Sequence, residues 1–188
     1  MHTQRGSVIA LLMVLAAGAR AQPASAPVAA PSKYKPCSLV TESQAEALTG
    51  QKVTTTTDRD IPYKMDATND HDGVISTCGY MYAPGKGLSL VVSSSPVTPE
   101  GRAKGEAKAK AAVEKVKTMG AKIEEKKYGA ITCSTVQMTG DTAMFSSTSC
   151  GAEKGPLFFA MTVSKGPNGF VAMDQLHSLA VTVLAGLP

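Results

Sequence analysis

The chain has 188 residues, of which 43% are hydrophobic and 18% are charged, a balance typical of one globular domain. Its formal net charge of +4 falls to +2 without residues 1–21, because that segment carries Arg5 and Arg20 but no acidic residue, which leaves 17 Lys and Arg against 15 Asp and Glu. A charge this nearly balanced excludes a strongly basic nucleic-acid-binding domain, and we expect no nucleic-acid partner.

Residues 1–21 have the pattern of a cleavable signal peptide. Arg5 supplies an early positive charge, Val8–Ala17 is almost unbroken apolar sequence, and Ala19-Arg20-Ala21 places small side chains where signal peptidase reads them. The apolar run is about half of the ~20 residues that a membrane span needs, and no later segment is longer. We therefore expect cleavage before Gln22 and a periplasmic or secreted protein with no transmembrane segment in its mature chain.

Residues 22–36 are rich in Ala and Pro, and prolines at this density disfavour both helix and sheet. We expect a disordered linker there, followed by a single disulfide-braced domain over residues 37–188.

The first elements of this domain have clear local signals. Thr41 and Gln44 form the pattern of a capping box, and Gly50 can end the helix in a left-handed turn. The β-branched run Val53–Thr57 predicts a strand. Asp58–Gly73 is polar and rich in turn residues, which predicts a loop.

Hairpin and helix patterns follow. Val74–Tyr82 and Leu88–Ser94 predict a hairpin across residues 83–87, and Pro99–Thr118 predicts a helix. Further strands are expected at Lys122–Lys126, Ile131–Met138, Ala143–Cys150 and Leu157–Ser164. A closing amphipathic helix is indicated by the spacing of Met173, Leu176, Leu179, Ala180, Val183 and Leu184.

Short internal matches suggest a duplication. Residues 48–53 resemble residues 118–123, and residues 76–79 resemble residues 148–151. Strands joined by short hairpins are antiparallel, and one face of their sheet must be covered. The sequence therefore predicts an α+β fold with an antiparallel sheet of about six or seven strands covered by helices, arranged as two α-β-β-β repeats plus a C-terminal helix.

The four cysteines, an even number in a chain with an export pattern, indicate disulfides, although four cysteines allow three pairings. If the hairpin around residues 139–142 is centred between Asp141 and Thr142, Cys133 lies directly opposite Cys150, close enough to bridge. That pairing leaves Cys37 with Cys78. Zinc binding is disfavoured because the chain lacks closely spaced cysteine pairs.

Three segments together resemble the opening of small exported lipoproteins that carry a domain of unknown function: Pro36–Thr41, Ala45–Gly50 and Cys78-Gly79-Tyr80. That resemblance implies a Cys37–Cys78 disulfide and no catalytic residues. The chain lacks the lipobox cysteine of that family, so membrane anchoring does not carry over. The order of elements also resembles PsbP-like domains, which have an antiparallel sheet with helices packed on it.

No motif predicts catalysis, a metal centre or a cofactor. Ser32–Lys35 matches S-x-x-K but lies in the linker, whereas that motif opens a buried helix. Asp66, Asp70 and Asp72 could surround Ca²⁺, but their spacing is irregular and no Glu closes the loop, so a solvated acidic loop is the preferred interpretation.

The helix at Pro99–Thr118 is rich in cations, which allows a face for an anionic partner, although a merely solvated helix face is the simpler interpretation. The candidate residues of this face are Arg102, Lys104, Lys108, Lys110, Lys115 and Lys117.

The function expected from these patterns is that of an exported, non-enzymatic binding domain that recognises a protein or an envelope component. One alternative is a periplasmic inhibitor or immunity protein, which needs an exposed apolar or aromatic protrusion. Another is a carrier of a small apolar ligand, which needs an apolar cavity of roughly 300 Å³ or more. An enzyme with an unrecognised site is the remaining class.

Overall fold

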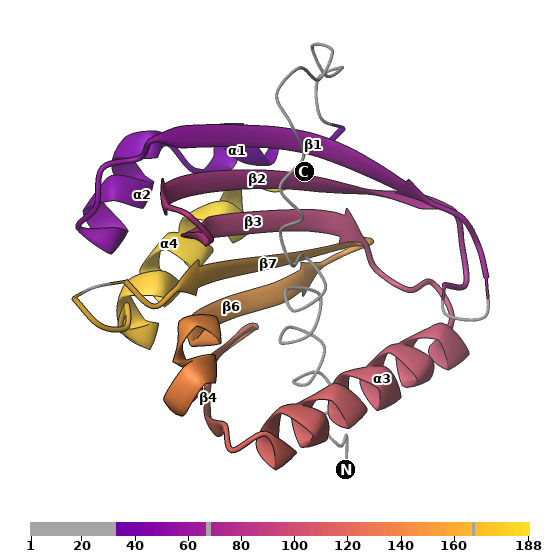
Figure 1. Ribbon diagram of the computed structural model, residues 1–188. Coiled ribbons are helices and arrows are strands. Elements are labelled where there is room, and N and C mark those ends of the chain that lie inside the picture. Colours follow the sequence, from indigo (N-terminus) through magenta and orange to yellow (C-terminus); the bar gives the residue numbers. More distant parts are fainter. Residues whose placement is uncertain (1–32, 67–68, 167) are drawn as a thin grey trace.

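The computed structural model describes residues 33–66, 69–166 and 168–188 (Figure 1). The predicted signal peptide, and the predicted linker as far as residue 32, lie outside the described residues. Within the described part of the chain, no helix has both the length and the apolar character needed to cross a bilayer.

Seven strands form one antiparallel sheet, which confirms the predicted α+β class. The sheet order is β1-β2-β3-β7-β6-β5-β4, so β3 and β7 form its centre and β1 and β4 its edges. The strands are β1 (Thr55–Tyr63), β2 (Gly73–Ala83), β3 (Lys86–Ser94), β4 (Lys122–Tyr128), β5 (Ile131–Gln137), β6 (Ser147–Lys154) and β7 (Leu157–Ser164).

In the described residues, four α-helices and one 3-10 helix accompany the sheet. They are α1 (Pro36–Leu39), α2 (Glu42–Thr49), α3 (Pro99–Thr118), η2 (Gly140–Phe145) and α4 (Met173–Gly186). The predicted signals of α2 are confirmed: Thr41 and Gln44 form the capping box, and Gly50 ends the helix with a φ of 66°, a conformation that favours glycine.

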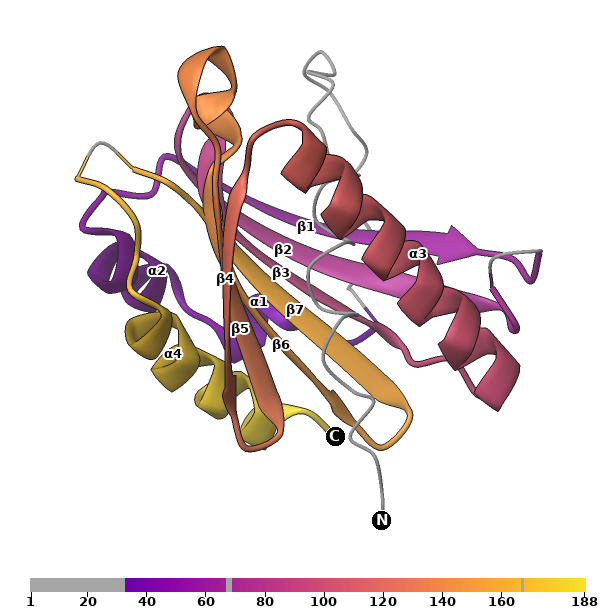
Figure 2. The same cartoon turned by 90° about the horizontal axis from the view of Figure 1, so that it is seen from below.

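The main hydrophobic core lies between one face of the sheet and helices α1, α2 and α4 (Figure 2). Leu176, Ala180 and Val183 of α4 are fully buried there against central strand residues such as Phe159 and Met161. The predicted helical spacing of α4 is thus confirmed, because its apolar stripe is the surface that the sheet covers.

Helix α3 lies over the opposite face of the sheet (Figure 2). Phe158 and Ala160 form a small buried cluster on that face. An ion pair ties the first turns of α3 to β6, with Arg102 Nη1 2.5 Å from Glu153 Oε2, and the Ser95 hydroxyl donates to Glu153 Oε1 at 2.9 Å. The prediction of helices on the sheet therefore holds for the face that packs against α1, α2 and α4, whereas α3 lies over the other face and is tied to it by these contacts at its start.

Both predicted disulfides are present. Cys37 of α1 bonds to Cys78 of β2, and Cys133 of β5 bonds to Cys150 of β6. Cys133 and Cys150 are directly opposite each other in the strand register, as the hairpin argument requires. The first disulfide fixes α1 to the sheet, and the second joins two neighbouring strands.

The prediction of two α-β-β-β repeats is wrong as a whole, because three strands follow α2 and four follow α3, although the last two strands of each half correspond. Cys78 pairs with Leu90, Leu90 with Met161, and Met161 with Cys150, so the two halves mirror each other about the contact between β3 and β7. Helices α2 and α3, which precede the two sets of strands, nevertheless lie on opposite faces of the sheet (Figure 2).

Several predicted strand boundaries were wrong, and the largest differences are in β1 and β6. The first strand begins at Thr55 and continues to Tyr63 through residues predicted as loop, because an edge strand tolerates charged side chains and Pro62. The strand predicted at Ala143–Cys150 begins only at Ser147, because η2 occupies the preceding residues.

The end of the predicted linker is also ordered. The Lys33 backbone N–H donates to Asp60 at 2.9 Å, the Tyr34 hydroxyl lies 3.2 Å from that of Ser94, and Pro36 is buried in the first turn of α1. A proline at that helix position loses no hydrogen bond, so proline content alone misplaced the boundary.

Candidate functional site: a polar pocket and the outer face of α3

A pocket of about 110 Å³ lies where the ends of β1, β2 and β3 meet the start of α3. Ile75 and Ser93 are direct cross-strand neighbours in this region. The pocket is lined by Tyr63, Asn69, Asp70, His71, Ile75, Ser93, Ser94, Pro96 and Gly101.

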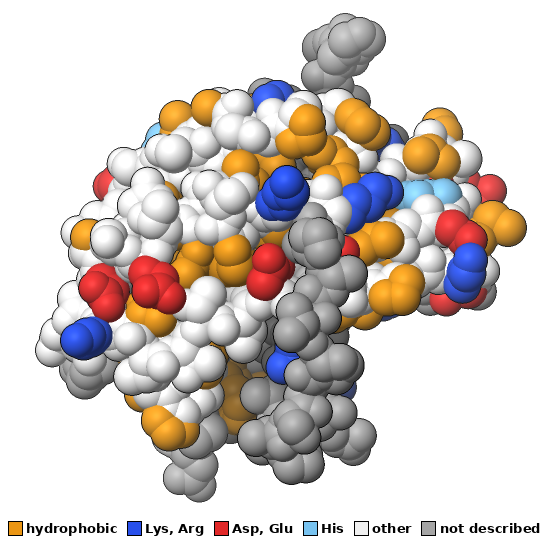
Figure 3. All heavy atoms as spheres, turned by 90° about the horizontal axis from the view of Figure 1, so that it is seen from above, with side chains coloured by type: hydrophobic (Ala, Val, Ile, Leu, Met, Phe, Trp, Pro, Cys, Tyr) orange, Lys and Arg blue, Asp and Glu red, His pale blue; other side chains and the backbone are white. Residues whose placement is uncertain are grey.

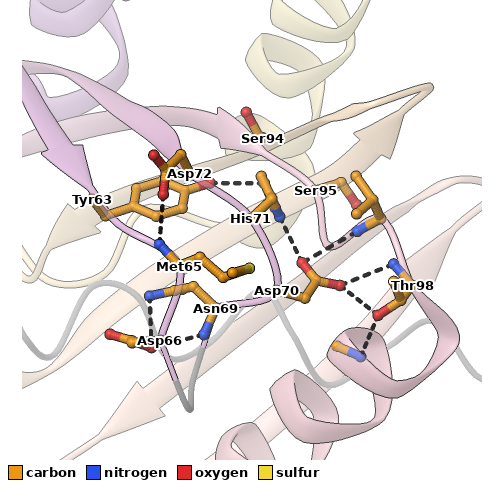
Figure 4. A network of polar contacts seen from close by, with 12 residues as sticks. Tyr63, Met65, Asp66, Asn69, Asp70, His71, Asp72, Ser94, Ser95 and Thr98 are labelled. Carbon is orange, nitrogen blue, oxygen red and sulfur yellow. Dashed lines mark hydrogen bonds and ion pairs between the residues drawn. The ribbon is translucent and has the colours of Figure 1, made fainter.

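Asp70 connects this pocket to α3 (Figure 4). Its Oδ2 accepts the Thr98 backbone N–H at 2.9 Å and the Thr98 hydroxyl at 2.6 Å, while Thr98 itself caps the helix by accepting from Gly101 N–H at 3.0 Å. A Cβ on Gly101 would lie 2.0 Å from Asp70 Oδ2, so this close approach requires glycine. Asp70 therefore anchors the N-terminus of α3.

His71 and Tyr63 extend the chain of contacts (Figure 4). His71 Nδ1 lies 2.6 Å from Asp70 Oδ1, and His71 Nε2 lies 3.0 Å from the Tyr63 hydroxyl. The order carboxylate, imidazole, hydroxyl is that of a catalytic triad. Burial, however, raises the pKa of the Tyr63 phenol above its ordinary value of 10.0, which keeps the hydroxyl protonated and poorly nucleophilic at neutral pH. The chain of contacts suits positioning of α3 better than nucleophilic catalysis.

The acidic loop does not gather its carboxylates around one point. Asp66 accepts from Asn69 N–H at 2.9 Å, Asp72 pairs with Lys64 at 2.7 Å, and Asp70 binds Thr98. Within residues 33–66, 69–166 and 168–188, no group of three or more His, Cys, Asp or Glu side chains is placed to hold a metal ion. Figure 3 shows acidic, basic and histidine side chains together at this end of the molecule. They form local pairs rather than a cation site.

Asp70→Asn is expected to lower the melting temperature at neutral pH, because hydrogen bonds from the Thr98 hydroxyl and from His71 hold the Asp70 pKa well below its ordinary value of 3.8. A lowered pKa stabilises the folded state fully above about pH 4 and loses that effect as the pH falls. The difference between Asp70→Asn and wild type in a melting series should therefore shrink below about pH 4. Asp72→Asn, at an exposed pair, is the control with a smaller effect. Equal melting temperatures of the Asp70 variant and wild type at neutral pH would contradict this role.

A second polar cluster joins β4 to α4. The Tyr128 ring stacks on His177 with centroids 4.2 Å apart, the Tyr128 hydroxyl donates to Asp174, and Lys126 Nζ lies 3.1 Å from Asp174. These contacts fasten the edge strand to the helix, so the cluster is structural.

The predicted cationic residues of α3 do not share one face. Arg102 turns toward the sheet and pairs with Glu153. At 3.6 residues per turn, Lys104, Lys108 and Lys115 lie along one edge of the helix, and Lys110 and Lys117 lie along the other. Lys104 pairs with Glu100 and Lys117 with Glu114, while the other three lysines make no ion pair within the described part of the chain.

Between these two edges lies a smooth strip of alanines. Ala103, Ala107 and Ala111 are exposed and lie four residues apart, whereas Ala109 on the opposite side of the helix is buried. We call these three alanines and the five lysines on their flanks the outer face of α3. Glu100 and Glu114 continue the alanine strip at its two ends, where they pair with Lys104 and Lys117. The outer face thus combines a flat centre with lysines along both sides.

Among the exposed large apolar side chains of the described residues, the aromatic one lies at the opposite end of the sheet. Phe145, at the end of η2, is 59% exposed. Its position and the pocket were not predicted. The pocket joins residues from three strands, a loop and a helix, and no local sequence pattern indicates such a meeting.

Comparisons with known proteins do not identify a family. No family model matches the chain, and no curated protein is significantly similar to it. The resemblance to exported lipoproteins therefore stays a hypothesis. Among solved structures, cyanobacterial PsbP (CyanoP) from Synechocystis is similar with a TM-score of 0.33 and 12% identity, and the match covers 74% of this chain and 95% of that one. A likeness this distant assigns no function to this chain.

Proposed function

We propose that the chain is an exported, non-enzymatic binding domain that recognises an acidic protein surface through the outer face of α3. The export pattern of residues 1–21 and the pairing of all four cysteines support an oxidising compartment, the periplasm or the medium.

The observation that carries this proposal is the arrangement of α3 itself. Asp70 and Glu153 hold the start of the helix, which presents the outer face away from the sheet. Lys108, Lys110 and Lys115 have no ion-pair partner within the described residues, so their charges are available to another molecule. Exposed alanines between them let a partner approach closely at little entropic cost, because alanine has no side-chain rotamers to fix.

The composition of the face favours protein over lipid or nucleic acid. Helices that bind in the plane of a membrane insert large apolar or aromatic side chains, and the outer face offers only alanine. Nucleic acids that bind as single strands need aromatic platforms, which this face also lacks. An acidic, flat protein surface is the remaining class of partner, because its charge complements the lysines of the outer face.

The expected result of replacing Lys104, Lys108 and Lys115 together by Gln is about tenfold weaker partner binding, since three exposed charge contacts contribute about 0.5 kcal/mol each. The mature protein would be used to capture envelope proteins, and the dissociation constant of the recovered partner measured by titration. Binding by wild type should also weaken when NaCl rises from about 50 to about 300 mM.

A matched variant removes the same charge elsewhere: Lys52, Lys122 and Lys127, all exposed, replaced by Gln. It should bind like wild type. Equal weakening by both triple variants would show a general charge effect and would reject the outer face as the binding surface.

An inhibitor or immunity protein is a second candidate, favoured by exposed Phe145. If Phe145→Ala abolishes capture while the α3 variant does not, this candidate replaces the first. The carrier alternative receives no comparable support, because the 110 Å³ pocket is far below roughly 300 Å³ and the residues between α4 and the sheet are tightly buried.

A further inference from the structure

The pocket beside α3 contains a buried hydroxyl that has no partner. Ser93 is only 1% exposed, it lines the pocket, and its Oγ makes no hydrogen bond within the described part of the chain. A buried polar group without a partner is costly and is rare in native proteins. The cost is removed if a bound molecule supplies the missing hydrogen bond.

The other polar groups of the pocket are already engaged. Both carboxylate oxygens of Asp70 accept hydrogen bonds, and His71 contacts Asp70 and Tyr63 through its two ring nitrogens. The Ser94 hydroxyl lies 3.2 Å from that of Tyr34. Among the buried side-chain atoms of the described pocket lining, Ser93 Oγ is therefore the one that a ligand would find without a partner.

The other residues that line the pocket determine the polarity, charge and size of the ligand that it can hold. Ile75, Pro96 and the Tyr63 ring present apolar surface to the pocket. The Asp70 carboxylate, with its pKa held low, stays negative at neutral pH and repels an anion. A cavity of about 150 Å³ accommodates benzene, which has six non-hydrogen atoms, so 110 Å³ limits the ligand to about four.

We propose that this pocket is a binding site for a small neutral molecule with a compact apolar body and one hydroxyl or amide group, which bonds to Ser93 Oγ. The alternative occupant is water alone. Water would form the missing hydrogen bond with the Ser93 hydroxyl but would leave the apolar surface of Ile75 and Pro96 hydrated. A ligand with an apolar body is favoured because it removes that surface from water.

Acetamide is the probe, and acetate, which has nearly the same shape but is an anion, is its matched control. Each is titrated into the mature protein at neutral pH while backbone amide chemical shifts are recorded by NMR. Acetamide should cause saturable shifts centred on Ile75, Ser93 and Gly101, with an affinity of about 10 mM, as expected for about four non-hydrogen atoms. Acetate should bind at least about tenfold more weakly because of Asp70.

Ser93→Ala separates a binding role from a structural one. The variant should melt no lower than wild type, because the hydroxyl it removes has no partner among the described residues, but it should bind acetamide about fivefold more weakly. Ser89→Ala, on the same strand and outside the pocket lining, should bind like wild type. Three results would overturn the proposal: no saturable shift up to about 100 mM amide, equal binding of amide and anion, or equal affinity in Ser93→Ala.

Discussion

Replacement of Cys37 and Cys78 together by Ala is expected to lower the free energy of unfolding by about 4 kcal/mol, because the disulfide closes a loop with a sequence separation of 41 residues. The bond also attaches α1 to the sheet, where the buried Tyr80 hydroxyl donates to the Val40 carbonyl and lies 3.4 Å from the Cys37 carbonyl. Without the bond, α1 keeps only these contacts and its packing.

Urea denaturation followed by circular dichroism measures this loss. The matched variant replaces Cys133 and Cys150 by Ala, which opens a shorter loop with a separation of 17 residues and should cost about 3 kcal/mol. A cost below about 1 kcal/mol for the Cys37 and Cys78 variant would show that α1 is held by packing alone.

Leu176→Ala in α4 is expected to cost about 3–5 kcal/mol, the range for a large aliphatic side chain removed from a tightly packed core. Leu176 is fully buried among residues of the sheet and of α4. The cost combines the lost transfer of apolar surface with the cavity left behind, because neighbours such as Phe159 and Met161 cannot collapse fully into the space.

Val181→Ala is the control on the same helix, since Val181 is 47% exposed and alanine favours the helix. It should change the free energy of unfolding by less than about 0.5 kcal/mol. A similar cost for both substitutions would mean that α4 does not pack on the sheet through the stripe that contains Leu176.

Local patterns predicted the parts of the fold that local physics controls. The Thr41 cap, the Gly50 stop and the apolar stripe of α4 depend on neighbours within one or two turns, so sequence alone indicates them. The opposed position of Cys133 and Cys150 was predictable because hairpin register follows from the pairing geometry of adjacent strands. The pairing of Cys133 with Cys150 is present although η2 makes the connection between β5 and β6 longer than predicted.

Features that depend on distant partners were not predictable. The strand from Thr55 to Tyr63 can contain polar residues because it is an edge strand that pairs with β2 on one side only. No local sequence pattern indicates that edge position. The sequence pattern places Asp70 in a solvated acidic loop, whereas the structure shows that it anchors Thr98, 28 residues further along the chain. The partnerless hydroxyl of Ser93 is visible only once the strands, the loop and α3 are assembled.

The division of the lysines on α3 is an intermediate case. The sequence identified the cationic helix, and helical geometry places Lys104 and Lys108 on the same edge. The Arg102 side chain points toward the sheet because it pairs with Glu153. Glu153 is 51 residues away in the sequence, and the folding of the sheet brings the two residues together. The charge of the helix was thus predictable, but the orientation of its outer face was not.

Mass spectrometry of the natively purified protein after alkylation of free thiols tests the central claim most directly, that this is an exported domain braced by covalent bonds. The expected intact mass is that of a chain that starts at Gln22 and carries no alkylated cysteine. After proteolysis, the peptides should be joined through Cys37–Cys78 and Cys133–Cys150. Four alkylated cysteines on a cytosolic chain that retains Met1 would contradict the account.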